Sequence, residues 1–173
     1  MPRLVNRIIS FILILLSGIL TLQGQEYIFD QEHYGVENGL PHREVNAVCE
    51  DSRGFVWVGT KEGLCRFDGY TFQLFPAAQY GFLSDDFNRI YQAPDGFLWL
   101  LTGKQAEDFD IWNPSTGVHT TFRKKFGADS KQHLPLFSEV FSCQDKAGNI
   151  YLQDTAQAAV WKFHPDSGLK PIH

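Results

Sequence analysis

The sequence is poor in clustered positive charge. It has 173 residues, with 15 Lys and Arg against 20 Asp and Glu, and a formal net charge of -5 at pH 7. Nucleic acid phosphates are bound by surfaces on which Lys and Arg gather, whereas the basic run here, Arg123 to Lys125, is short. We therefore expect that no nucleic acid contacts this chain.

Cysteine is scarce as well. Cys49, Cys65 and Cys143 are an odd number of cysteines without Cys-x-x-Cys spacing, so they predict neither a disulfide framework nor a zinc site. We expect them to be buried as small apolar side chains. We also expect no metal and no other cofactor.

Patterns of common catalytic sites are missing from the sequence. It contains no Gly-x-Ser-x-Gly, no His-Glu-x-x-His and no calcium loop of the Asp-x-Asp-x-Asp-Gly type, each of which places reacting or ligating groups at a fixed spacing. We therefore predict no catalytic residues and no enzymatic activity for this chain.

A long apolar run occurs at the N-terminus. Arg3 and Arg7 precede an apolar stretch over residues 8–22, and Gly24 follows it. A positive start, a short apolar segment and a small residue at the cut are typical of a secretory signal peptide. Because the stretch is shorter than the roughly 20 residues that span a bilayer, we predict a signal peptide over residues 1–24 and export of the remainder. An uncleaved anchor is the alternative.

What the sequence does contain is an internal repeat. The segment Asp51–Thr60 returns as Ala93–Thr102 and, more faintly, as Asp145–Asp154. Each copy joins a turn of Asp, Gly and small residues to an apolar, aromatic strand, with roughly 40 to 50 residues between copies, as in the blades of a β-propeller. The sequence therefore predicts an all-β fold of propeller blades, each a four-stranded antiparallel meander.

Short apolar segments between Asp/Gly turns give the expected strands. We assign residues 39–80 to blade 1, 81–132 to blade 2 and 133–173 to a partial blade 3. The expected strands are 45–50, 55–59, 64–68 and 72–75 in blade 1, 87–93, 97–101, 108–112 and 118–122 in blade 2, and 140–144, 150–153 and 160–163 in blade 3.

About three blades form an incomplete ring, since propellers close with roughly four to eight. Residues 25–38 are rich in Tyr and Phe and precede the first inner strand, so we predict that they form an outer strand belonging to a closing blade. The partners of such a strand would lie further along a longer protein. We expect this chain to be the N-terminal piece of one.

The repeated aromatic residues occupy equivalent strand positions. Because each blade must bury an aromatic face against the next, we interpret them as the structural core of the repeat, not as ligand platforms. They are Trp57, Trp99, Tyr151, Phe55 and Phe97.

Polar residues in the loops before the inner strands are the better ligand candidates, because these loops face the central channel of a propeller. We predict His42 and Arg43 before the first inner strand, and Asp85 and Asp86, with Ser84, before the second. Arg and Asp form paired hydrogen bonds to hydroxyl or carboxylate groups. Tyr80 is a further candidate.

The segment Gly39-Leu-Pro-His-Arg-Glu-Val-Asn-Ala-Val-Cys-Glu-Asp-Ser-Arg-Gly-Phe-Val-Trp-Val-Gly-Thr-Lys-Glu-Gly-Leu-Cys-Arg-Phe-Asp-Gly69 resembles the two-component regulator propeller repeat. The resemblance implies the N-terminal periplasmic sensor part of a Bacteroidetes hybrid two-component system protein, a sensor histidine kinase and response regulator anchored in the inner membrane. It also implies an oligosaccharide ligand derived from glycans, further blades that complete the propeller, and a homodimer in the full-length protein. No kinase motif occurs in this chain.

Two other interpretations remain open. Propeller enzymes of the streptogramin lyase type carry similar Asp-x-x-Gly-x-x-Trp repeats, and a secreted propeller used as a protein-interaction scaffold would leave the same sequence pattern. The three interpretations share one fold and differ in ligand.

Overall fold

The computed structural model describes residues 31–102, 108–127, 137–154 and 158–172, together with residues 3, 5–7 and 11. The chain divides into two compact units, Met1–His33 and Tyr34–His173, and the second contains the sheets. The predicted signal peptide lies almost entirely outside the described residues. Within those that are described, no helix combines the length and the apolar character needed to cross a bilayer.

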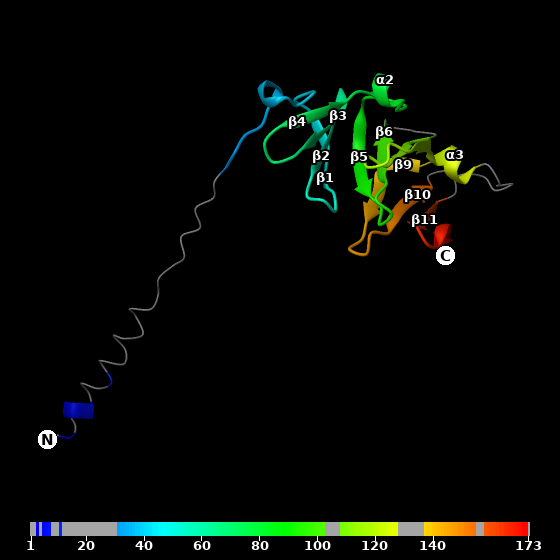
Figure 1. Cartoon of the computed structure of the whole chain (residues 1–173). Coiled ribbons are helices and arrows are strands. Elements are labelled where there is room, and N and C mark those ends of the chain that lie inside the picture. Colours follow the sequence, from blue (N-terminus) through cyan, green and yellow to red (C-terminus); the bar gives the residue numbers. More distant parts are fainter. Residues whose placement is uncertain are drawn as a thin grey trace. The chain divides into compact units, whose positions relative to one another are not determined.

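Three sheets of four strands each make up the second unit (Figure 1). The first sheet contains β1 (Val45–Glu50), β2 (Val56–Thr60), β3 (Gly63–Phe67) and β4 (Phe72–Phe75). The second contains β5 (Phe87–Gln92), β6 (Leu98–Thr102), β7 (Asp110–Trp112) and β8 (His119–Thr121). The third contains β9 (Phe137–Gln144), β10 (Ile150–Asp154), β11 (Ala159–His164) and β12 (Gly168–Ile172).

Every sheet is an antiparallel meander in which consecutive strands are neighbours. The first strand of one sheet lies beside the first strand of the next, β1 against β5 and β5 against β9. This arrangement confirms the predicted all-β fold of propeller blades. Each sheet falls within one of the three repeat units assigned from the sequence.

Equivalent turns and irregularities recur from sheet to sheet. Gly54, Gly96 and Gly148, on which the repeats align, have φ angles of 84, 80 and 82°, a left-handed conformation that favours glycine. The pairing of β1 with β2 shifts register between Val45 and Ala47, and that of β5 with β6 shifts at the equivalent place, between Phe87 and Arg89. The repeat is therefore one of backbone geometry as well as sequence.

The third sheet has a fourth strand that the sequence analysis did not predict. β12 pairs with β11 from His164↔Gly168 to Val160↔Ile172. The strand contains Pro171, which lacks an N–H for a ladder and is tolerated mainly on edge strands. β12 lies at the edge of its sheet, so the expectation of a partial third blade is wrong within the described residues.

The segment before the first sheet also differs from the prediction. Residues 25–30 of the predicted outer strand lie outside the described residues. In the rest of the segment, residues 31–35 carry no regular element and Val36–Asn38 forms a 3-10 helix, η1. Gly39 ends this helix with a φ of 109°, a left-handed conformation that favours glycine. The predicted outer strand is therefore wrong for residues 36–38, whereas Tyr27 and Phe29 lie outside the described residues.

Two short helices complete the described elements. Helix α2 (Ala77–Tyr80) connects the first sheet to the second, and α3 (Phe122–Phe126) follows β8. The Thr121 hydroxyl accepts a hydrogen bond from the Lys124 N–H and so caps α3. The strand expected over residues 118–122 is therefore shorter and turns into a helix at Phe122.

Two hydrophobic cores lie on the two faces of the second sheet. Leu98, Leu100 and Trp112 pack with Trp57 and Phe75 in the first core. Trp99, Leu101 and Ile111 point the other way and pack with Ile150 and Phe163 in the second. Alternation of side chains across a strand explains how β6 is buried along its whole length.

Close approach of the first two sheets depends on Gly59 in β2. A Cβ at this position would lie 3.0 Å from the Phe87 carbonyl oxygen and 3.1 Å from Ile90 Cδ1, so these neighbours would have to move by a few tenths of an ångström. The absence of a side chain therefore allows β2 to contact β5.

The repeated aromatic residues differ in burial. Trp57 and Trp99 have no exposed surface, whereas Phe55, Phe97 and Tyr151 are half-buried. The cysteines differ too: Cys65 is buried, Cys49 is half-buried and Cys143 is exposed. The expectation that all three cysteines are buried is thus wrong for Cys143. Burial raises the pKa of the Cys65 thiol to about 12.

In the first and third sheets, an aspartate accepts a hydrogen bond from the repeated Trp or Tyr residue. Asp51 Oδ2 accepts a 3.0 Å hydrogen bond from the indole Nε1 of Trp57, and Asp145 Oδ2 accepts one of 3.0 Å from the Tyr151 hydroxyl. In the second sheet Ala93 occupies the equivalent position. The buried Nε1 of Trp99 accordingly has no hydrogen-bond partner among the described residues.

Each of these carboxylates also orders its turn. Asp51 Oδ1 accepts the backbone N–H groups of Arg53 and Phe55. Burial alone would raise the pKa of Asp51, but the hydrogen bonds from Trp57, Arg53 and Phe55 outweigh it and lower that pKa. For Asp145, hydrogen bonds led by that of the Asn149 side chain lower the pKa to about 2.

We predict that Trp57→Phe destabilises the fold more than Trp99→Phe. Both indoles are fully buried, so the two substitutions remove similar packing, but only the first removes a hydrogen-bond donor from a buried carboxylate. The expected difference in the free energy of unfolding is about 1–3 kcal/mol. Urea denaturation followed by circular dichroism measures it, and equal losses would contradict the proposed role of Asp51.

We predict that the contribution of Asp145 to stability is lost in acid. A carboxyl whose pKa is lower in the folded state stabilises the fold fully above its unfolded value of about 4, and the contribution disappears as the pH falls through the folded value. The stability difference between the wild type and Asp145→Asn should therefore shrink as the pH falls from about 5 towards the folded pKa of about 2. A difference that stays constant in urea titrations from pH 7 to pH 3 would exclude this linkage.

Candidate functional site

The predicted ligand residues lie in two loops that the fold brings together. His42 and Arg43 precede β1, and Asp85 and Asp86 precede β5, the two inner strands that lie side by side. The Asn46 side-chain amide donates a 3.5 Å hydrogen bond to Asp86 Oδ1 and so joins strand β1 to the second loop. We call His42, Arg43, Ser84, Asp85 and Asp86 the loop site.

Several of these polar groups are engaged in the fold. His42 Nδ1 accepts a hydrogen bond from the Glu44 N–H, and Ser84 Oγ accepts one from the Asp86 N–H. Asp85 Oδ1 accepts a 2.8 Å bond from the Ala77 N–H, at the first residue of α2. Arg43 and Asp85 are both exposed. Because Asp85 already accepts the Ala77 N–H, the Arg43 guanidinium is the more available of the two to a ligand.

A buried aspartate of the second sheet holds the loop that carries Ser84, Asp85 and Asp86. Asp110 has no exposed surface, and its Oδ2 accepts a 3.0 Å hydrogen bond from the Leu83 N–H. Its Oδ1 is hydrogen-bonded to His119 Nε2 at 2.8 Å. Burial raises the pKa of Asp110 against the opposing effect of the Leu83 and His119 hydrogen bonds. The sequence analysis did not predict these hydrogen bonds, because Leu83, Asp110 and His119 come from three separate segments of the chain.

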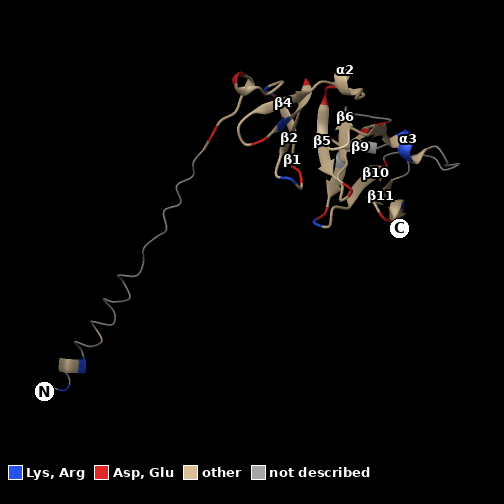
Figure 2. Cartoon of the chain, viewed as in Figure 1, with Lys and Arg blue, Asp and Glu red and all other residues tan. Residues whose placement is uncertain are grey.

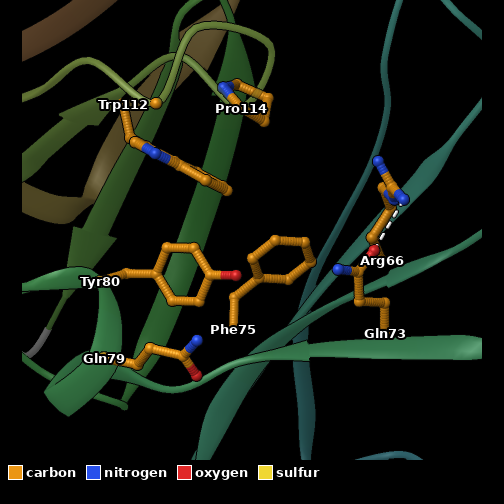
Figure 3. A pocket seen from close by; sticks show the side chains of 8 residues that line it. Arg66, Gln73, Phe75, Gln79, Tyr80, Trp112 and Pro114 are labelled. Atoms are coloured by element: carbon orange, nitrogen blue, oxygen red, sulfur yellow. Dashed lines mark hydrogen bonds between the residues drawn. The ribbon is translucent and has the colours of Figure 1, made fainter.

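A groove opens between the first and second sheets (Figure 3). Its volume is about 460 Å³. Arg66 of β3 and Gln73 of β4 lie across it from Tyr80 and Gln79 of α2 and from Trp112 of β7. The groove is lined by Arg66, Gln73, Phe75, Gln79, Tyr80, Trp112, Pro114 and Gly117. Of these residues, Tyr80 is the one that the sequence analysis had proposed as a ligand candidate.

A smaller hollow of about 140 Å³ lies beside the loop site. Asp85 and Pro41 line it, together with Leu74 and Phe75. Phe75 therefore borders both this hollow and the groove.

Positive charge gathers on helix α3 (Figure 2). Lys125 Nζ lies 3.9 Å from Asp95 Oδ2 and 4.7 Å from the centre of the Phe97 ring. At least one charge of the short basic run is thus engaged by neighbouring side chains. Metal-ligating residues are dispersed: across the described residues, no three His, Cys, Asp or Glu side chains form a group able to hold an ion.

Comparison with known proteins gives one family match. Residues 39–62 match the family model described as Two component regulator propeller. They begin at the glycine that ends η1 and include all of β1 and β2. No curated protein sequence matches the chain.

Two solved structures illustrate the likeness in fold. One is the extracellular domain of a protein described as the hybrid two component system BT3049 from B. thetaiotaomicron, with a TM-score of 0.54 and 16% identity over 82% of this chain and 25% of that one. The other is a catalytically inactive virginiamycin B lyase from Staphylococcus aureus with Quinupristin, with a TM-score of 0.49 and 13% identity over 78% of this chain and 42% of that one. The chain thus spans a quarter of the first structure's length.

The class of protein follows from these observations together. Four-stranded meanders whose inner strands adjoin, with a likeness to the BT3049 domain, define a β-propeller. The matched segment identifies one particular repeat: residues 39–62 match the two-component regulator propeller repeat that the sequence analysis had found there.

We predict that Asp110→Ala frees the loop over residues 81–86. The Leu83 N–H loses its acceptor, so its amide hydrogen should exchange with solvent at least about tenfold faster, which corresponds to 1.4 kcal/mol or more. Native-state hydrogen exchange by NMR measures this rate. Asp68→Ala is the matched control, because Asp68 accepts from Tyr70 and Thr71 in its own exposed turn. An unchanged exchange rate at Leu83 in Asp110→Ala would show that Asp110 does not hold this loop.

Proposed function

We propose that this chain is the ligand-sensing propeller segment of a hybrid two-component signalling protein. The observation that carries the proposal is the family match over residues 39–62, which coincides with the inner strands of the first sheet. The chain contains no kinase motif, so its part in signalling is to bind and not to transfer phosphate. We take the segment itself to be non-enzymatic.

The proposed location is the periplasm, with the parent protein anchored in the inner membrane. Arg3 and Arg7 followed by the apolar stretch over residues 8–22 support export. The partners of this segment are then the remaining blades of the parent propeller and, in the full-length protein, a second copy.

The proposed ligand is an oligosaccharide released from a glycan, bound at the loop site. Arg43 offers an exposed guanidinium with five donors, and Asp86 is hydrogen-bonded to Asn46 in strand β1 of the first sheet. Asp85 contributes mainly by holding α2 in place. A sugar that contacts Arg43 and Asp86 would contact two adjacent blades and stabilise their packing.

We predict that Arg43→Gln weakens oligosaccharide binding by about tenfold or more, because a hydrogen bond to a charged group contributes about 1.5–3 kcal/mol. Isothermal titration calorimetry of the full chain with di- to hexasaccharides from xylan, mannan, arabinan and pectin measures the affinity. Asp68→Asn, a change in an exposed turn, is the control and should bind as the wild type does.

Three outcomes would overturn the proposal. The first is the absence of binding by any saccharide of the panel. The second is cleavage of a streptogramin B antibiotic by the chain, which would favour a propeller enzyme of the streptogramin lyase type. The third is a gene that continues beyond the His173 codon without encoding a membrane helix and a kinase, which would favour a secreted scaffold.

A further inference from the structure

The groove between the first and second sheets has the volume of a small-ligand site. Its volume of about 460 Å³ lies within the roughly 300–1,000 Å³ typical of ligand pockets. It is bounded by β3, β4, α2 and the turn between β7 and β8, so its walls come from two adjacent blades.

Three aromatic rings form a packed wall of the groove. Phe75 and Tyr80 have ring centres 5.1 Å apart, Phe75 and Trp112 5.3 Å, and Tyr80 and Trp112 5.5 Å. Phe75 and Trp112 are almost fully buried, whereas Tyr80 is half-buried. Tyr80 is therefore the ring that a ligand contacts, and the other two hold it rigidly in position (Figure 3).

A fixed positive charge lies on the opposite wall. The Arg66 guanidinium stacks 4.2 Å from the centre of the Phe55 ring and donates a 2.7 Å hydrogen bond to Gln73 Oε1. Among the described residues, Arg66 forms no ion pair and is the one charged residue that lines the groove. An immobilised guanidinium without an acidic partner matches the planar geometry of a carboxylate.

Neutral polar groups complete the lining. The exposed side-chain amides of Gln73 and Gln79 each supply donors and an acceptor, and the Tyr80 hydroxyl supplies both. Neighbouring hydroxyl groups of a sugar require such mixed partners. An aliphatic or purely cationic ligand would leave these groups unpaired.

We propose that this groove binds an acidic saccharide, a sugar of the uronate type. Its carboxylate pairs with Arg66, its ring contacts the face of Tyr80, and its hydroxyl groups bond the amides of Gln73 and Gln79. This inference rests on the proposed sugar-sensing function and adds to it a second site, whose lining includes none of the loop-site residues.

The test compares α-1,4-linked trigalacturonate with α-1,4-galactotriose, which has the same linkage but no carboxylates, by calorimetry on the full chain. We expect Arg66→Gln to weaken trigalacturonate binding by about tenfold or more while galactotriose binding is unchanged. Tyr80→Ala should weaken trigalacturonate binding as well. Lys146→Gln, which removes one positive charge from the exposed turn between β9 and β10, should leave trigalacturonate affinity within twofold of the wild type.

Other results would either support the groove assignment or overturn it. If Arg66→Gln proves unstable by circular dichroism, Arg66→Lys, which keeps the charge but loses the planar fork, should show the same selective loss. Equal binding of the two trisaccharides, or loss in Arg43→Gln with none in Arg66→Gln, would overturn the groove assignment and leave the sensing function standing. If neither these trisaccharides nor the glycan panel bind, both proposals fail. Displacement of trigalacturonate by an acidic peptide of higher affinity would replace the sugar with a peptide ligand.

Discussion

Face-to-face packing on both sides of the second sheet determines where the other described elements lie. On one side Trp112 contacts Trp57, with ring centres 5.6 Å apart. On the other side Trp99 contacts Phe163, at 4.3 Å. Large aromatic side chains bury more apolar surface than any others and so dominate the energetics of such contacts. Because the second sheet takes part in both cores, neither neighbouring sheet can shift without exposing aromatic surface to water.

Hydrogen bonds to Asp carboxylates add to this packing and position the turns and loops. The Asp51 and Asp145 carboxylates each tie a turn to the aromatic residue of their own sheet. Asp110 instead ties the second sheet to the loop before β5, and Asp85 ties the same loop to α2. The loop site and the groove therefore share a support: the segment that carries Asp85 and Asp86 also fixes the helix that carries Tyr80.

The sequence predicted the features that repeat. The left-handed glycines at Gly54, Gly96 and Gly148 and the aromatic strands after them gave the three sheets and most strand boundaries. Irregular features were missed. The edge strand β12, which contains Pro171, was not predicted, and Val36–Asn38 forms a 3-10 helix at the end of the segment predicted as an outer strand.

The groove could not have been predicted in the same way. Arg66, Tyr80 and Trp112 belong to two repeat units and occupy non-equivalent positions in them, so no period relates them. Their proximity arises when two blades pack. The loop site was easier to locate, since its residues precede equivalent strands, although the sequence did not show that Asp85 serves as the acceptor for the first N–H of α2.

Because Ala93 stands in the second sheet where Asp51 stands in the first, the two equivalent indoles differ in their hydrogen bonding. Trp57 and Trp99 occupy equivalent strand positions without exposed surface, one donating to a carboxylate and the other to no described acceptor. Their indole N–H protons should therefore resonate at well-separated chemical shifts. Because Trp57 belongs to the core between the first and second sheets and Trp99 to the core between the second and third, the two signals report separately on the integrity of each blade interface in a single spectrum.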